Sequence, residues 1–300
     1  MGDIMTTSKN INYFLIDGKS DGRIKCTFLN WTGLIYKVPR TYLDESKNID
    51  AMKNTGIYFL FGKTDDDENC VYVGQARNRK NGEGLLGRVQ EHIKDSFYFT
   101  DAVMLTTQNN IFGPTEISYL ENKFTNLSID ADRYNVRNGN EPNPGTVTEE
   151  KESELLEFIE YSKLVMGVLG YKIFIPINNK DESVDSDDLY LYLSRRDAKT
   201  NREIKATCKR TSEGFVVLKG SDFCEIDADH IKNKTSIKNI REKCINSGGV
   251  VDGKLIKDYL FNSPSYAATF VLGKSSNGRT EWKDKDGVTL KEIEEKEIDG

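Results

Sequence analysis

The residues best suited to chemistry lie in the middle of the chain, where an arginine and a histidine stand four positions apart. This spacing places Arg88 and His92 on one face of a helix, where both can act on the same group. A guanidinium matches the geometry of a phosphate and stabilises its developing charge, and an imidazole exchanges protons near neutral pH. The pair therefore predicts phosphate binding with proton transfer. The alternative is a solvated arginine beside a histidine at the edge of an apolar stripe.

A carboxylate suited to a divalent cation follows on the next expected helix. Glu121 and Glu116 border the apolar stripe of residues 114–128 on opposite sides, so helical periodicity does not choose between them. A single carboxylate that leaves several waters in place suits Mg²⁺, with Mn²⁺ as a substitute. A cation there would neutralise phosphate charge and stabilise a leaving oxygen. The alternative for Glu121 is an ordinary acid on a helix surface.

Two tyrosines lie in apolar, β-rich runs ahead of these residues. Tyr58 ends the tripeptide Gly-Ile-Tyr, and Tyr72 begins the tripeptide Tyr-Val-Gly. A tyrosine has a pKa of about 10, so it acts as a base at neutral pH only beside a cation, a metal-bound water or a proton relay. Alternatively, both are core residues whose hydroxyls reach a polar partner.

The order of the two tripeptides, the arginine, the glutamate and a later asparagine resembles the GIY-YIG nuclease superfamily, over roughly residues 54–142. The resemblance implies that the tyrosines project into an active-site groove and position or deprotonate the attacking water. It selects Glu121 over Glu116 as the metal ligand, and a histidine four residues after the arginine is similar to some restriction-enzyme members. Asn138 and Asn135 are both candidates for the family asparagine, or either is a turn residue. The catalytic candidates are Tyr58, Tyr72, Arg88, His92, Glu121, Asn138 and Asn135.

The function implied by the resemblance is a metal-dependent endonuclease that cleaves phosphodiester bonds in DNA, with Mg²⁺ as cofactor. An alternative from another class is a nucleic-acid-binding module whose nuclease site is inactive or depends on a partner. A third is a regulatory or assembly protein without DNA contact. The net charge of -6, from 42 basic and 48 acidic residues, argues mildly against binding of DNA by bulk charge alone.

The chain departs from the family pattern between the second tyrosine and the arginine. A lysine found shortly after the second tripeptide in some relatives is replaced by Gln75. The gap is also longer than in compact members. It carries three basic residues that we expect to face DNA, namely Arg77, Arg79 and Lys80.

The hydrophobic pattern predicts the elements that would position these residues. Strands are expected at 24–30, 33–38, 56–62, 71–74, 101–107, 172–176, 189–193, 203–209 and 214–221. Helices are expected at 41–53, 84–95, 114–128, 149–169 and 236–246, while 254–261 and 265–272 fit either state. The expected fold class is α+β, with a small mixed sheet flanked by helices, as in GIY-YIG nucleases, and a second α+β domain.

Composition divides the chain into four expected segments. They are an N-terminal extension with a hairpin at 1–50, the nuclease-like domain with its following helix at 51–178, an acidic linker at 179–188 and a C-terminal accessory domain at 189–300. Residues 213–290 resemble a domain of unknown function that recurs behind GIY-YIG modules. The alternative is a compact accessory fold with ordinary turns.

The most basic stretch of the chain lies at 195–210, with seven basic and two acidic residues. Binding of phosphates there would weaken steeply with salt. The nucleic-acid contacts expected in this stretch are Arg195, Arg196, Lys199 and Arg202.

The composition of the whole chain is that of a globular protein, with 37% hydrophobic and 30% charged residues. No run approaches the roughly 18 apolar residues of a membrane span, and no signal peptide is recognisable, so we expect no membrane contact and a cytoplasmic location. The chain has five cysteines, none in a Cys-x-x-Cys pair, and only two histidines. These counts argue against a disulfide framework and against a zinc site.

Overall fold

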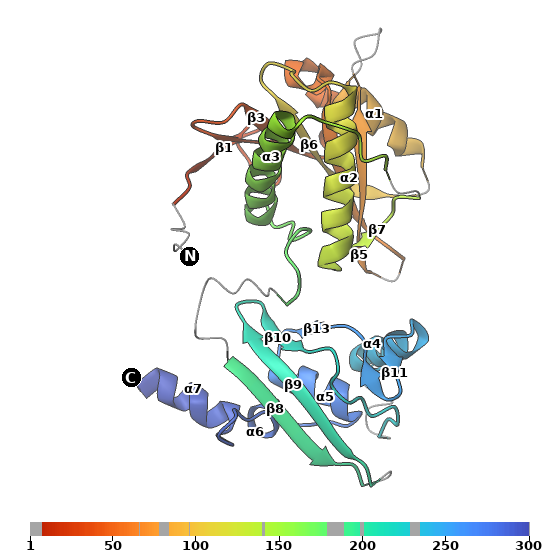
Figure 1. Ribbon diagram of the computed structural model, residues 1–300, viewed down its shortest axis with the longest axis vertical. Coiled ribbons are helices and arrows are strands. Elements are labelled where there is room, and N and C mark those ends of the chain that lie inside the picture. Colours follow the sequence, from red (N-terminus) through yellow and green to blue (C-terminus); the bar gives the residue numbers. More distant parts are fainter. Residues whose placement is uncertain are drawn as a thin grey trace. The chain divides into compact units, whose positions relative to one another are not determined.

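The computed structural model describes residues 8–65, 67–77, 84–95, 97–139, 142–178, 189–198, 201–228 and 235–299, and it has the expected α+β class. It divides into two compact units, Met1–Pro176 and Ile177–Gly300 (Figure 1). The expected acidic linker at 179–188 lies outside the described residues.

The first unit is built on a seven-stranded sheet with the order β1-β2-β3-β6-β4-β5-β7. Neighbouring strands are antiparallel except β5 and β7, which run parallel. The strands are β1 (Ile11–Leu15), β2 (Ile24–Phe28), β3 (Gly33–Pro39), β4 (Gly56–Lys63), β5 (Asn69–Ala76), β6 (Phe99–Thr107) and β7 (Asn135–Val136).

The segment expected as an N-terminal extension is part of this sheet. Its strand β3 pairs with β6 from Gly33 opposite Thr107 to Pro39 opposite Asp101. Most of β3 is buried, because residues of both its faces enter a core. The single helix expected at 41–53 is instead three 3₁₀ turns, Arg40–Tyr42, Asp44–Asn48 and Asp50–Lys53.

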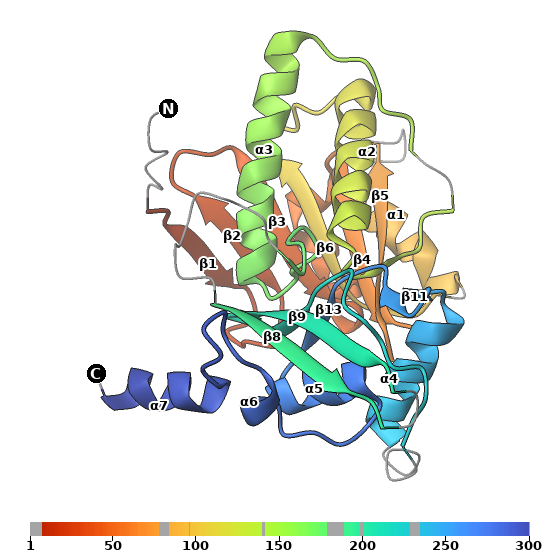
Figure 2. The same cartoon turned by 60° about the horizontal axis from the view of Figure 1, so that its bottom comes forward.

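Helices cover both faces of the sheet, which explains why β4 is apolar almost throughout. Its alternate residues Ile57, Phe59 and Phe61 enter a core shared with α2 (Pro114–Ala131) and α3 (Glu149–Val168). Figure 2 shows these two helices over one face of the sheet. The residues between them, Tyr58 and Leu60, enter the opposite core with α1 (Leu85–Glu91).

Two further expected elements of this unit differ from the structure. The helix expected at 84–95 is α-helical only to Glu91 and ends in a 3₁₀ turn, His92–Lys94. The strand expected at 172–176 is not formed. The Ile175 N–H donates to the Lys172 carbonyl at 3.2 Å and closes a turn, while Ile173 and Phe174 are buried in the core beneath α2 and α3. These apolar residues fill a core without pairing in a sheet.

The second unit has a four-stranded antiparallel sheet with the order β13-β10-β9-β8. These strands are β8 (Leu189–Arg196), β9 (Glu203–Thr211), β10 (Gly214–Val217) and β13 (Tyr259–Phe261), and a second pair is β11 (Val250–Val251) with β12 (Lys254–Leu255). The helices are α4 (Thr235–Asn246), α5 (Pro264–Leu272), α6 (Gly278–Glu281) and α7 (Leu290–Asp299). One sheet face joins α5 and Trp282 in a single apolar core. The ambiguous segments 254–261 and 265–272 are therefore short strands and a helix, respectively.

The described helices include none with the length and apolar character that a membrane span requires. All five cysteines are buried free thiols.

Candidate active site

Tyr58, Tyr72 and His92 lie together on the side of the sheet that faces α1. The Tyr58 Oη lies 2.8 Å from Nε2 of His92. The ring centroids of the two tyrosines are 6.1 Å apart, and those of Tyr72 and His92 are 4.9 Å apart. Tyr58 pairs with Gly74 and Leu60 with Tyr72 across β4 and β5, so both tyrosines project from the same face of the hairpin.

The glycines of the two tripeptides allow the strands to close around Tyr58. A Cβ added to Gly74 would lie 2.4 Å from both Cζ and Oη of Tyr58, far inside van der Waals contact. A Cβ on Gly56 would lie 2.1 Å from the carbonyl oxygen of Leu105 on β6. Each glycine therefore stands where another chain segment approaches closely.

Asp95 holds the other side of the His92 ring. Its Oδ2 lies 2.5 Å from Nδ1 of His92. Because a carboxylate accepts hydrogen bonds, these partners assign the hydrogen to Nδ1 and leave Nε2 to accept from the Tyr58 hydroxyl. Tyr58, His92 and Asp95 thus form a chain along which a proton can move. Sequence reasoning missed Asp95, although an acid three residues after a candidate histidine is a usable signal.

Burial governs the protonation of Tyr58. Its side chain is fully buried, and this burial raises its pKa well above the ordinary value, with a smaller contribution from Tyr72. The Arg88 guanidinium opposes the rise through its charge and a hydrogen bond, whereas the charge of Glu121 adds to it. The Tyr58 phenol is therefore a hydrogen-bond donor at neutral pH, and it lies within electrostatic reach of both the arginine and the glutamate.

Arg88 lies on the exposed side of α1. Its Nη1 donates to Oε2 of Glu91 at 2.5 Å, and the two side chains are 37% and 40% exposed. This hydrogen bond raises the pKa of Arg88, so the guanidinium is always charged. A guanidinium has five N–H donors, so a phosphate can bind alongside or in place of Glu91.

Glu121 lies on α2 and is held by Gln75 from β5. The Gln75 Nε2 donates to Oε2 of Glu121 at 2.7 Å. Burial raises the pKa of Glu121, and the hydrogen bond from Gln75 and the charges of Arg88 and Arg77 oppose that rise. Glu116, which periodicity left as an alternative, instead lines a separate cavity. Of the two glutamates, Glu121 is therefore the one grouped with the other candidates.

A divalent cation fits the donors beside Glu121. The Oε1 of Gln75 is buried and has no hydrogen-bond partner within the described ranges. A carboxylate and an amide oxygen are hard ligands of the type that Mg²⁺ prefers, and Mg²⁺ keeps several of its waters. The described residues contain no cluster of three or more His, Cys, Asp or Glu side chains around a common point. Glu121 and Gln75 would thus hold a largely hydrated ion.

The two candidate asparagines occupy different places. The side chain of Asn138 accepts from the Val73 N–H at 3.0 Å and donates to the Val73 carbonyl at 2.8 Å. It therefore fixes the backbone between Tyr72 and Gly74. Asn135 lies on β7, opposite Cys70 of β5, and is exposed. Asn138 is the one that braces the hairpin.

An open groove of about 390 Å³ lies beside the site and is lined by Arg77, Ser118 and Asn143, among others. Ser118 connects it to the site, because the Gln75 Nε2 that binds Glu121 also lies 3.5 Å from the Ser118 hydroxyl. Arg79 and Lys80, the other basic residues expected to face DNA, lie outside the described residues.

The basic stretch of the second unit is partly paired with acids. Arg195 of β8 forms an ion pair with Glu281, and Arg202 forms one with Asp222. Arg196 is exposed at the end of β8. Lys199 lies outside the described residues.

Comparison with known proteins finds a similarity only in the second unit. No curated protein and no solved structure matches the chain. One family model matches residues 197–294, and no model matches the segment that contains the tyrosine motifs. The nuclease resemblance therefore stays a prediction, whereas the expectation of a domain of unknown function near the C-terminus is confirmed. Residues 197–294 are similar to the family described as Domain of unknown function (DUF4357).

Proposed function

We propose that the first unit is a divalent-metal-dependent nuclease that cleaves phosphodiester bonds in DNA. The observation that carries the proposal is the convergence of Arg88, His92 and Glu121 on the buried phenol of Tyr58. They come from α1, the 3₁₀ turn that follows it and α2. Metal-dependent hydrolysis of a phosphodiester uses a phosphate clamp, a proton acceptor and a cation site, and these side chains are of the types suited to the three roles. Their order along the chain also resembles that of GIY-YIG nucleases.

In the proposed reaction, a water oxygen forms a bond to phosphorus while the bond from phosphorus to the leaving oxygen breaks. Tyr58 takes a proton from the water as its own hydroxyl proton passes to Nε2 of His92. Asp95 stabilises the resulting imidazolium, and Tyr72 orients the water. The leaving oxygen takes a proton from solvent.

Arg88 and Glu121 are proposed to compensate the negative charge of the phosphate. Arg88 pairs with the phosphate and stabilises the negative charge of the transition state. Glu121 and the Oε1 of Gln75 would hold Mg²⁺. The bound ion supplies positive charge that neutralises the phosphate and the leaving oxygen.

The contact between Arg88 and Glu91 favours a second candidate, a nucleic-acid-binding protein whose nuclease site acts only with a partner. Glu91 occupies one nitrogen of the guanidinium that the phosphate needs. In this case, a partner or a particular substrate structure would displace Glu91 and release Arg88. Glu91→Gln would then increase cleavage by the protein alone.

The test is nicking of supercoiled DNA by the full chain in Mg²⁺ and in Mn²⁺, with EDTA as the blank. We expect Glu121→Ala and Arg88→Ala to reduce nicking by about a hundredfold or more, because each removes charge stabilisation at the phosphate. Glu116→Gln is the matched control on the same helix and should cleave normally. Normal cleavage by a folded Glu121→Ala protein would refute the assignment, and binding without cleavage in every condition would favour the second candidate.

A further inference from the structure

The outer face of the second sheet carries exposed tyrosines. Along β8, Leu191 and Leu193 are buried in the core, so the residues between and beside them face outward. Tyr190 and Tyr192 are 40% and 45% exposed. Because they are two residues apart on one strand, their backbone positions are about 7 Å apart along the sheet.

Basic and hydroxyl side chains lie beside these tyrosines. Tyr192 pairs across the sheet with Thr207 of β9, and Ser194 pairs with Lys205. The Nζ of Lys209 lies 5.8 Å above the ring of Tyr190. Glu203 forms an ion pair with Lys205 at 3.1 Å and accepts from the Ser194 hydroxyl, and Lys209 is buried. The face therefore combines aromatic rings with hydroxyls and with cations that are partly paired.

A groove of about 490 Å³ opens on this face, and we call it the Tyr192 groove. All of its lining residues belong to the second unit. Its charged lining residues are Lys205, Lys219, Lys254 and Asp222, so the cations exceed the anions by two. This positive groove contrasts with the net charge of -6 of the chain.

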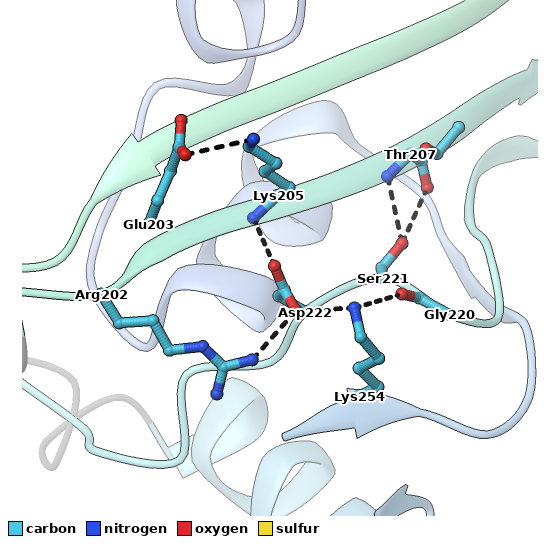
Figure 3. A network of polar contacts seen from close by, with 8 residues as sticks. All are labelled: Arg202, Glu203, Lys205, Thr207, Gly220, Ser221, Asp222 and Lys254. Carbon is cyan, nitrogen blue, oxygen red and sulfur yellow. Dashed lines mark hydrogen bonds and ion pairs between the residues drawn. The ribbon is translucent and has the colours of Figure 1, made fainter. Parts of the chain in front are cut away.

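Asp222 organises the floor of the groove (Figure 3). Its carboxylate accepts from the Lys205 backbone N–H at 2.9 Å, from Lys254 Nζ at 2.9 Å and from Arg202 at 3.0 Å. The Lys254 and Arg202 side chains nevertheless remain 56% and 46% exposed. The aspartate thus holds two cations in place while leaving them accessible.

Ser221 fixes the groove to β9. Its hydroxyl accepts from the Thr207 N–H at 3.0 Å and lies 3.3 Å from the Thr207 carbonyl (Figure 3). Backbone hydrogen bonds from Leu218 to Thr207 and from Asp222 to Lys205 also hold the ends of segment 218–222 beside β9. The segment therefore widens the surface on which a ligand can lie.

We propose that the Tyr192 groove binds single-stranded nucleic acid, with bases stacked on Tyr192 and Tyr190 and phosphates paired with the lysines. Aromatic rings on an open sheet, interleaved with cations, match the alternation of flat bases and charged phosphates in a single strand. In a duplex, the base faces are stacked on one another and cannot reach these rings. The proposal does not depend on the nuclease site of the first unit.

The test is fluorescence anisotropy of labelled oligo(dT), and of a duplex, with the full chain in EDTA, so that no cleavage intervenes. We expect tighter binding of the single strand. Tyr192→Ala should weaken it about fivefold to a hundredfold, as expected for loss of one stacked base. Tyr192→Phe should bind like the wild type because it keeps the ring. Tyr266→Ala, which removes a tyrosine of 46% exposure from α5, is the matched control and should also bind normally.

Salt dependence separates the charge contacts from stacking. Each lysine–phosphate contact contributes about 0.7 to the slope of log affinity against log salt for a single strand. Lys219→Ala should therefore reduce that slope by about 0.7, while Tyr192→Ala leaves it unchanged. Because the binding is measured in EDTA, failure of the nuclease proposal leaves this result intact.

Three results would overturn the inference. They are an absence of binding by the wild type, a preference for the duplex, and unchanged affinity in the double variant Tyr190→Ala/Tyr192→Ala. Equal loss in Tyr192→Phe and Tyr192→Ala would overturn the stacking mode.

Discussion

Substitution of Gly74 by alanine should destabilise the first unit and disturb the candidate site together. The new methyl group would lie 2.4 Å from Cζ and Oη of Tyr58, against a normal separation of at least about 3.5 Å. The phenol must therefore move by about 1 Å. It is fully buried and hydrogen-bonded to His92 at 2.8 Å, so a shift of that size breaks the hydrogen bond or strains the surrounding core.

Overpacking of this kind costs about 1–3 kcal/mol, measurable as a lower free energy of unfolding in urea. Gly167→Ala is the matched control. A Cβ there would have its nearest neighbour at 3.8 Å, so we expect unchanged or slightly higher stability from the better helix propensity of alanine. Adding Tyr58→Leu to Gly74→Ala should relieve the clash, so the two losses should be less than additive. Wild-type stability and cleavage in Gly74→Ala would refute this reasoning.

Three further predictions concern charged groups. Asp95→Asn should leave the melting temperature unchanged and reduce DNA nicking by about tenfold or more, because the carboxylate no longer orients the His92 ring. Burial alone would raise the pKa of Asp222, but hydrogen bonds and nearby cations outweigh burial and lower it. The Asp222 carboxylate therefore stabilises the fold above its unfolded pKa of about 4, and this stabilisation is lost as the pH falls through its lower folded pKa. In Asp222→Asn, the free energy of unfolding in urea should therefore fall less steeply at acid pH. Arg241 is fully buried and pairs with Asp227 at 2.7 Å. Arg241→Ala should therefore lower the free energy of unfolding by about 3–5 kcal/mol, measured in urea, because it breaks a buried ion pair.

The local elements around the site could be predicted from sequence because their signals are local. The apolar stripe of α2 and the proline at its start predict the helix that carries Glu121. The two apolar runs around an acidic loop predict the pairing of β4 with β5, which places both tyrosines on one face. Periodicity could not choose between Glu121 and Glu116, because both border the same stripe; only packing against β5 separates them.

Contacts between distant segments could not be predicted in this way. The pairing of Gly33 with Thr107 depends on residues far apart in the chain, so the first strands resembled a separate extension. In the sequence, Gln75 is notable only because it replaces a lysine found in some GIY-YIG nucleases. Its hydrogen bond to Glu121 joins two distant segments and is seen only in the structure. The basic stretch likewise showed its charges but not the acids, such as Glu281, that pair with them.

We propose above all that Glu121 of the first unit holds a hydrated cation against a phosphodiester. The most direct measurement is a crystal structure of the full chain grown with Mn²⁺ and recorded at an anomalous wavelength. We predict an anomalous peak about 2–2.3 Å from a carboxylate oxygen of Glu121, with the Arg88 guanidinium and the Tyr58 hydroxyl facing the same space. An ordered Glu121 without a peak, or one that faces away from Arg88, would contradict the account.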